Sequence, residues 1–290
     1  MRTTALGLCL AGCLASAPVH ADIVTLSALK DNTLYQEDSG LLSNGSGAYL
    51  FAGINGRGEI RRGLIAFDVS AIPSNAVVSG VSLRMRMSRT TDGVQPVTLH
   101  RSLQNWGEGI SNAAANEGAG IASAPGDATW VHSFFPATEW LDENMVSSPG
   151  GVFVAAASAT ANVDQIGFYN WSTAGVIADV QAWVAAPQSN FGWVIRGYED
   201  GVSSAKRFDS RNNNTVANRP SLTVEFTIPV GSCPCDLNDD ALVTSADFFD
   251  FLTAFFSGAI EADFDQSGEI NSADFFAYIT CFFSLPTPCA

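Results

Sequence analysis

Two segments near the C-terminus place oxygen-bearing side chains at nearly every second position. The first segment begins at Asp236 and the second begins at Asp263, 27 positions later, and ten of their 22 aligned positions are identical. Calcium in proteins takes about six to eight oxygen ligands, and a tight loop that turns alternate residues inward can supply them. The spacing therefore predicts two calcium-binding loops of the EF-hand type.

The two loops offer ligands from equivalent positions. In the first loop the predicted ligands are Asp236, Asn238, Asp240, the Leu242 carbonyl, Thr244 and Asp247. In the second loop they are Asp263, Asp265, Ser267, the Glu269 carbonyl, Asn271 and Asp274. Ala241 stands where glycine would ease the first turn, and Ser267 replaces a carboxylate or amide. We expect two Ca²⁺ ions to offset most of the excess charge, and the loops to loosen without them.

A phenylalanine-rich stripe follows each loop at helical spacing. The first stripe is Phe248, Phe249, Phe251, Leu252, Phe255 and Phe256, and the second is Phe275, Phe276, Tyr278, Ile279, Phe282 and Phe283. This spacing predicts one apolar face on each of two short helices, which can then pack against each other. A unit of this size is marginally stable by itself, so we expect bound calcium and disulfides to stabilise it.

The cysteines suit the disulfides of an exported chain. Four of the six lie close together near the C-terminus: Cys233, Cys235, Cys281 and Cys289. We expect them to form two disulfides, with three connectivities open.

Residues 1–21 combine an early arginine, a short apolar stretch and small residues before a cleavage site, which is typical of a signal peptide. Lipidation at Cys13 is the alternative, and no later stretch is long and apolar enough to span a bilayer.

Charge divides the remaining chain into two parts. Residues 233–290 carry eight Asp, two Glu and no Lys or Arg, which accounts for −10 of the total net charge of −15. This asymmetry predicts a first module over residues 22–226, a linker over 227–232 and an acidic module over 233–290. Neither part is basic enough to indicate nucleic-acid binding.

The first module is predicted to be mainly β. Residues 81–88 alternate between apolar and polar side chains with period two, and five further segments have a similar pattern between Gly- and Asn-rich turns. Only residues 172–187 have helical spacing, which predicts one short helix across an end of the sheets. Many short strands in about 200 residues predict a β-sandwich or jelly roll. Its six tryptophans are expected to fill the core, with exposed stacking platforms as the alternative.

Outward arginines are the candidate ligand contacts of this module. Arg84 and Arg86 lie on the polar face of one strand, and Arg196, Lys206 and Arg207 join them if their strands are neighbours. Such arginines suit a polyanionic sugar chain, although outward arginines also discourage edge pairing and form local ion pairs. We expect Arg61, Arg62, Arg211 and Arg219 to form internal ion pairs, and Asp68 to accept backbone N–H groups.

No catalytic constellation is evident in the sequence. The two histidines beyond the signal peptide, His100 and His132, lack metal-binding spacing, and no nucleophile motif occurs. A pair of carboxylates for glycoside hydrolysis is the remaining alternative, because such pairs can lie far apart in sequence. The acidic residues of the loop-rich middle are Glu108, Glu117, Asp127, Glu139, Asp142 and Glu143. We expect a non-catalytic protein.

Several stretches in a fixed order carry a family resemblance. They are "DNTLYQ" from Asp31, "RRGLIAFDVSAIP" from Arg61, "NWGEG" from Asn105 and the closing "SRNNNTVANRPSLTVEF" from Ser210. The module resembles the DNRLRE-domain family of exported β-sandwich modules, some of which bind acidic polysaccharides. Thr33 stands where the family has arginine. The resemblance implies carbohydrate binding.

The acidic module carries a second resemblance. Two loop-then-helix repeats without an entering helix, bounded by cysteines and rich in "ADFF", look like the GC-type dockerin-like modules of planctomycete proteins. The resemblance implies docking onto a cohesin-like partner, with Ser245, Ala246, Ser272 and Ala273 at the recognition positions. A calcium-stabilised cap without a partner is the alternative.

Together these features predict an exported carbohydrate-binding or surface-display protein, secreted or held at the cell surface. Its β module would bind a polysaccharide, acidic in character, and its dockerin-like module would tether it through calcium. A polysaccharide lyase or glycoside hydrolase is one alternative. A structural surface protein without a glycan ligand is the other.

Overall fold

A computed structural model describes residues 21–201, 203–228, 235–238, 240, 242–265 and 267–284. Residues 1–20 of the predicted signal peptide, Cys13 among them, lie outside the described residues, as do 229–232 of the predicted linker. Ala241, Cys233 and Cys289 also lie outside them. The contacts of the chain divide it into two compact units. Residues 21–228 are called the β unit below, and the described residues of 235–284 are called the helical unit.

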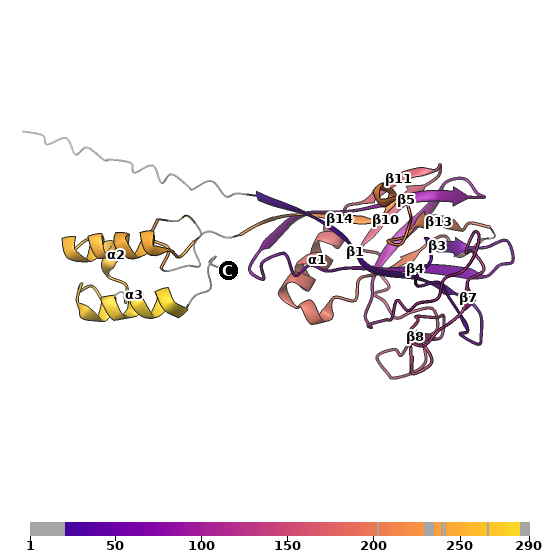
Figure 1. Ribbon diagram of the computed structural model, residues 1–290, viewed down its shortest axis with the longest axis horizontal. Coiled ribbons are helices and arrows are strands. Elements are labelled where there is room, and N and C mark those ends of the chain that lie inside the picture. The colour runs from indigo at the N-terminus through magenta and orange to yellow at the C-terminus, as the bar shows by residue number, and fades with distance from the viewer. Residues whose placement is uncertain are drawn as a thin grey trace, which may run out of the picture. The chain divides into compact units, whose positions relative to one another are not determined.

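The β unit consists mostly of strands (Figure 1). They are β1 (Ala21–Tyr35), β2 (Leu42–Ser43), β3 (Tyr49–Ile54), β4 (Ile60–Phe67), β5 (Val77–Thr90), β6 (Gln95–Arg101), β7 (Ile121–Ala122), β8 (His132–Phe134), β9 (Thr138–Glu139), β10 (Ala159–Val163), β11 (Gly167–Trp171), β12 (Trp193–Arg196), β13 (Lys206–Asp209) and β14 (Ser221–Thr227). Its helical elements are α1 (Ala174–Ala185) and the 3-10 helices η1 (Pro187–Ser189) and η2 (Val216–Asn218).

Ten strands form one sheet that curls back on itself. The order is β1-β14-β5-β13-β3-β4-β12-β6-β10, with β11 paired to β5. Strand β1 pairs with β14 along its first part and with β4 along its second, with a register shift between Ala28 and Lys30. Such an irregularity lets one strand bend from one part of a sheet to another. The predicted mainly β fold is confirmed, and the strand pairing gives it a barrel-like form in place of two separate sheets.

The core follows from the predicted alternation along β5. Val81, Leu83, Met85 and Met87 are buried, whereas the residues between them are partly exposed. Successive side chains of a strand point to opposite faces, so one face of β5 joins the core and the other meets solvent. All six tryptophans are buried, which confirms their predicted role as core filler and excludes exposed stacking platforms. They are Trp106, Trp130, Trp140, Trp171, Trp183 and Trp193.

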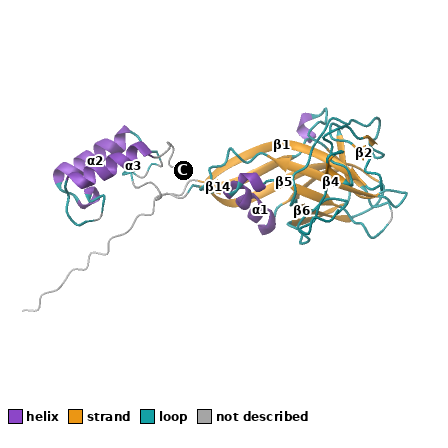
Figure 2. Ribbon diagram, turned by 90° about the horizontal axis from the view of Figure 1, so that it is seen from below, coloured by secondary structure: helices purple, strands orange, loops and turns teal. Residues whose placement is uncertain are grey.

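Helix α1 lies at one end of the sheet (Figure 2) and confirms the helix predicted over residues 172–187. Thr173 caps its first turn by accepting a hydrogen bond from the Val176 N–H. Val180, Trp183 and Val184 are buried against the strands, and the rings of Trp183 and Trp193 lie 4.5 Å apart. The helix therefore completes the core where the strands leave it open.

The helical unit contains α2 (Ser245–Ser257), η3 (Ile260–Ala262) and α3 (Ser272–Ser284). The ring of Phe248 lies 5.8 Å from that of Phe282, and the ring of Phe255 lies 6.1 Å from that of Phe275. Residues early in α2 therefore face residues late in α3, so the two helices are antiparallel. At their centre the rings of Phe251 and Tyr278 stack at 4.0 Å, with both side chains buried.

The apolar stripes predicted for α2 and α3 include residues that do not pack between the helices. Phe249 and Phe256 on α2 are 63 % and 81 % exposed, and Phe276 and Phe283 on α3 are 66 % and 78 % exposed. The stripe that packs runs through Phe248, Phe251, Leu252 and Phe255 on α2 and through Phe275, Tyr278 and Phe282 on α3. Neighbouring helical residues differ by about 100° around the axis, so the residue after a packed phenylalanine can turn to the flank of the helix, as the four exposed phenylalanines do.

Candidate functional site

Three carboxylates of the second predicted calcium loop meet in the structure. Asp263 follows η3, Asp265 lies two residues later, and Asp274 lies in the first turn of α3. One oxygen of each lies within 4.8 Å of the others. Asp274 is buried, Asp263 is partly buried and Asp265 is exposed. This arrangement presents hard oxygen donors to one point, as a calcium site requires.

The backbone of the second loop folds around these carboxylates. Asp274 accepts hydrogen bonds from the Asn271 N–H at 2.8 Å and from the Asp265 N–H at 3.1 Å. These two donors hold the pKa of Asp274 below its usual value. The Gly268 N–H donates to Asp263 Oδ2 at 2.9 Å, and Gly268 has φ of 85°, a left-handed conformation that glycine adopts without strain.

One oxygen in this cluster has no hydrogen-bond partner. Asp263 Oδ1 is buried and accepts no hydrogen bond from the described residues. A buried carboxylate oxygen without a donor is costly, and a cation would satisfy it. The donor set and this orphaned oxygen both fit Ca²⁺, which would supply positive charge and bind the oxygens of Asp263, Asp265 and Asp274.

The first loop repeats the same backbone pattern. Asp247 accepts the Leu237 N–H at 3.0 Å through Oδ1 and the Thr244 N–H at 2.8 Å through Oδ2. Burial raises the pKa of Asp247, but these backbone donors outweigh burial and lower it overall. Asp236 Oδ1 accepts the Asp240 N–H at 3.1 Å. These hydrogen bonds bring Asp236, Asp240 and Asp247 into one loop.

The ninth-position residues are helix caps. Thr244 forms a capping box with Asp247 and accepts the Ala246 N–H at 3.1 Å. Asn271 likewise accepts the Ala273 N–H at 2.8 Å. The ligand assignment missed this role, although an N-cap residue followed three positions later by an acid is a recognisable signal.

The remaining predicted ligands lie on the loop rims. Leu242 N–H donates to Asp240 Oδ1 at 2.9 Å, and Ser267 N–H donates to Asp265 Oδ1 at 3.0 Å. Asn238 Oδ1 accepts the Asp240 N–H at 3.0 Å. The Glu269 carbonyl accepts a hydrogen bond from the Ser267 hydroxyl at 3.3 Å, so this carbonyl turns toward its own loop.

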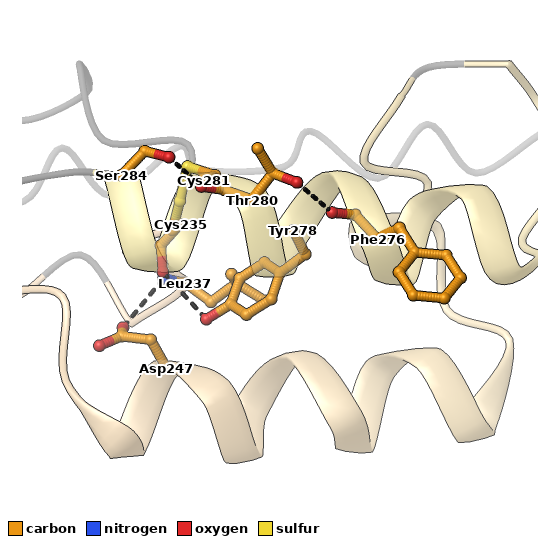
Figure 3. The surroundings of a disulfide bond; sticks show 8 residues. All are labelled: Cys235, Leu237, Asp247, Phe276, Tyr278, Thr280, Cys281 and Ser284. Atoms are coloured by element: carbon orange, nitrogen blue, oxygen red, sulfur yellow. Dashed lines mark hydrogen bonds between the residues drawn. A yellow bond between two sulfur atoms is a disulfide. The ribbon is translucent and has the colours of Figure 1, made fainter.

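A disulfide joins the start of the first loop to α3. Cys235 and Cys281 are bonded, with their Cα atoms 6.1 Å apart. Beside the bond, the Tyr278 hydroxyl donates to the Cys235 carbonyl at 3.2 Å, and the Leu237 N–H reaches Asp247 (Figure 3). One disulfide among the four predicted cysteines is therefore defined. It ties the start of the first acidic loop to the aromatic core of the helical unit.

The predicted partner positions are exposed at the beginnings of the two helices. They are Ser245, Ala246, Ser272 and Ala273. Because the helices are antiparallel, these two dipeptides lie at opposite ends of the pair.

The three arginines predicted to contact ligand already have partners. The Arg84 guanidinium lies 3.4 Å from the centre of the Phe168 ring, and Arg86 pairs with Asp209 at 3.0 Å. Arg196 pairs with Glu199 at 2.6 Å. Arg196 belongs to β12, which pairs with β4 and β6, so it does not join Arg84 and Arg86 on β5.

Lys206 and Arg207 belong to β13, which does pair with β5. Lys206 is fully buried, and its ammonium donates to the Thr90 hydroxyl at 2.8 Å and to the Asp92 carbonyl at 3.1 Å. Of these two residues, only Arg207 is exposed enough to contact a ligand beside β5.

Most acidic residues of the loop-rich middle hold their loops in place. Glu117 accepts hydrogen bonds from the Asn44 side chain at 2.8 Å and from the Tyr49 N–H at 2.9 Å. Asp127 accepts the Ile110 N–H at 2.9 Å. Asp142 accepts two backbone N–H groups of its own turn, and Glu139 and Glu143 are exposed. These contacts give the carboxylates structural roles and identify no pair facing a cleft.

The segments that carry the family resemblance of the β unit meet in one hydrogen-bonded cluster. Glu108 forms a bidentate ion pair with Arg211 and accepts the Asp31 N–H at 2.9 Å. Asp31 accepts the Arg211 N–H at 2.6 Å, and the Asn32 side chain donates to the Glu108 carbonyl at 2.8 Å. A side chain at Gly109 would overlap Asp127, with its Cβ 1.4 Å from Oδ1. The cluster fastens three distant segments of the chain together.

Asp31 makes the stability of the β unit depend on pH. Burial raises the pKa of Asp31 to about 7, with Glu108 and Glu117 adding to the rise and Arg211 opposing it. The native state then holds a proton that the unfolded chain releases, so stability falls as pH rises from about 4 to about 7. We expect Asp31→Asn to reduce this fall, measured by urea unfolding followed through tryptophan fluorescence.

Asp38→Asn is the matched control, because Asp38 is exposed in the following turn. Its unfolding free energy should change with pH as that of the unmodified protein does. An Asp31→Asn protein with the same pH dependence as the unmodified one would contradict the role given to Asp31.

Two comparisons with known proteins were negative. No protein-family model matches the chain, and no curated protein matches it. None of the described helices has the length and apolar character needed to cross a bilayer. The geometry of the two units is therefore the basis of the function proposed below.

Proposed function

We propose that the protein is an exported, non-catalytic carbohydrate-binding or surface-display protein, tethered through a calcium-stabilised, dockerin-like helical unit. The observation that carries this proposal is the carboxylate cluster of the second loop. Asp263, Asp265 and Asp274 converge within 4.8 Å, and one buried oxygen of Asp263 lacks a donor. A loop built only for packing gains nothing from this arrangement, whereas a calcium loop depends on it.

An exposed aromatic face supports the tethering role. Phe249 and Phe256 of α2 recur as Phe276 and Phe283 of α3, 27 positions later in each case. Because the helices are antiparallel and share one packed stripe, the approximate two-fold symmetry turns both pairs toward the same side of the helical unit. Exposed aromatic side chains grouped on a small unit are typical of a surface that binds another protein.

Charge favours a basic partner for this face. Residues 233–290 carry no Lys or Arg. Two Ca²⁺ ions would offset most of the charge of the six loop carboxylates but would leave residues 233–290 negative overall, so two copies of the unit would repel each other. A cohesin-like protein with apolar pockets and basic groups around them would complement both features.

The arginine-bearing strands support carbohydrate binding by the β unit. Arg207 lies on the solvent face of β13, which pairs with β5. Guanidinium groups suit acidic sugars because they donate paired hydrogen bonds to carboxylates and sulfates.

Isothermal titration calorimetry of the full chain tests the proposal. Calcium is titrated first, and an acidic polysaccharide such as alginate and a neutral glucan are titrated next into the calcium-loaded protein. We expect calcium binding and a preference for the acidic polymer. Absence of calcium binding would contradict the tether, and absence of any polysaccharide binding would favour a structural surface protein without a glycan ligand. Release of new reducing ends from alginate would favour an enzyme.

A further inference from the structure

A pocket of about 300 Å³ opens where strands β3, β4, β5 and β13 meet. Its volume is at the lower end of the range of small-molecule pockets, about 300–1,000 Å³. The residues that line it are Phe51, Asn55, Gly56, Arg61, Arg89, Thr90, Thr91, Asn116, Gly118, Ala205 and Arg207. Three of these are arginines, and none is acidic.

Two of the arginines face each other across the strands. Arg207 of β13 is the register partner of Arg89 of β5, and a register irregularity at Ser88 brings them opposite. Like charges directly opposite in an antiparallel pair are destabilising. Bulges of this kind occur beside binding sites, where they redirect a side chain. An anion bound between the two guanidinium groups would offset this repulsion.

Neither arginine of this pair forms an ion pair within the described part of the chain, and Asp209 and Glu117 act on Arg207 only from a greater distance. Among the described residues, no carboxylate lies within 4.0 Å of the guanidinium of Arg89 or Arg207. Arg207 donates through Nε to the Ser88 hydroxyl at 3.1 Å, and its guanidinium lies 3.7 Å from the centre of the Tyr49 ring. These contacts orient Arg207 and leave its terminal nitrogens available. Arg89 is exposed.

Arg61 lines the same pocket, with its charge paired with Glu59. Its side chain is buried and is held by the Gly118 carbonyl at 3.3 Å and by Glu59 at 2.9 Å. The buried ring of Phe51 adds apolar surface to the lining. A pocket with cationic donors and an aromatic wall suits a sugar residue that carries one anionic group.

The other arginine surfaces fit an anion less well. Arg84 lies against Phe168, and Arg86 is paired with Asp209. Arg196 lines a second pocket that also contains the carboxylates of Glu199 and Asp200, which would repel an anionic ligand. The pocket around Arg89 therefore differs from the surfaces around Arg84, Arg86 and Arg196 in having no acidic residue in its lining.

We infer that the pocket lined by Arg61, Arg89 and Arg207 binds the carboxylate or sulfate group of an acidic sugar residue. The inference rests on the proposed carbohydrate binding and names the site and the ligand chemistry. Arg89 and Arg207 hold the anion between them, and Phe51 contacts the sugar ring.

Calorimetry of the calcium-loaded full chain tests the inference with three probes: alginate for carboxylates, dextran sulfate for sulfates and a neutral glucan. We expect Arg89→Ala to weaken binding of the preferred acidic polymer about 10- to 100-fold, as loss of a charge-assisted contact does. Arg207→Ala should have a similar effect. Arg84→Ala is the matched control and should leave the affinity unchanged, since Arg84 lies outside the pocket lining.

The outcomes separate the site from the function. Unchanged affinity in Arg89→Ala and Arg207→Ala, with binding by the unmodified protein, would overturn the pocket while the proposed function stands. A loss confined to Arg84→Ala would do the same and would favour the solvent face of β5. Failure of the unmodified protein to bind either acidic polymer would contradict both. Tryptophan fluorescence melting verifies that each variant is folded, because all six tryptophans are in the β unit.

Discussion

Asp263→Ala is expected to weaken calcium binding at the second loop on the order of 100-fold or more. The substitution removes one of three carboxylates that converge on one point, and it removes the buried oxygen that lacks a hydrogen-bond donor. Changes next to a metal site typically cost about 10- to 100-fold in affinity, and loss of a direct ligand costs at least as much. Calorimetric titration of the full chain with Ca²⁺ measures the effect.

Asp250→Asn is the control for this substitution. Asp250 is an exposed acid of α2 outside both loops, so its replacement removes one negative charge without removing a ligand. Its calcium affinity should stay within about twofold of that of the unmodified protein, because exposed charges are strongly screened. Equal losses in the two variants would show that general charge, and not the loop geometry, governs binding.

Phe251→Ala is expected to destabilise the helical unit by about 3–5 kcal/mol. Phe251 is fully buried, and its ring stacks on that of Tyr278 at the centre of the helix pair. A unit this small has little stability to spare, so the calcium-loaded variant should lose most of its protected amides in α2 and α3. Hydrogen exchange followed by mass spectrometry measures this loss in the full chain.

Phe249→Ala provides a matched comparison two positions away on the same helix. Phe249 is 63 % exposed, so truncation should change the stability by no more than about 0.5 kcal/mol. Similar exchange in the two variants would contradict the assignment of Phe251 to the core and of Phe249 to the exposed flank of α2. Tryptophan fluorescence of the β unit should be the same in both variants.

Local patterns in the sequence predicted much of the local structure. The alternation along β5, the helix now seen as α1 and the two acidic loops followed by helices all depend on residues close together in the chain. Asp68 also accepts the N–H of Ser70, as expected for an acid at a strand end. In each case, local spacing and backbone preference are enough to select the structure.

Features that depend on distant residues could not be predicted in this way. Arg89 and Arg207 become neighbours only because β13 pairs with β5 and a bulge at Ser88 sets their register. Asp209 likewise engages Arg86, 123 positions away, only in the folded protein. The predicted ligand arginines had the right charge and strand face, but spacing does not reveal which of them are already paired.

The exposed phenylalanines show a limit of helical patterns. The helical pattern placed Phe249 and Phe256 in the same apolar stripe as Phe251. Adjacent apolar residues make the predicted stripe wider, but they do not show which part of it contacts the partner helix. The antiparallel packing of α2 on α3 decides which flank is covered. Packing within the helical unit does not account for the exposed phenylalanines, so their exposure is an argument for a binding surface.

The most direct test of the central claim is amide hydrogen exchange of the full chain in calcium and after chelation. If the acidic loops are calcium sites, chelation should remove protection from α2 and α3 while the exchange of the β unit stays the same. Unchanged protection of the helices after chelation would contradict calcium stabilisation, and with it the calcium-dependent tether.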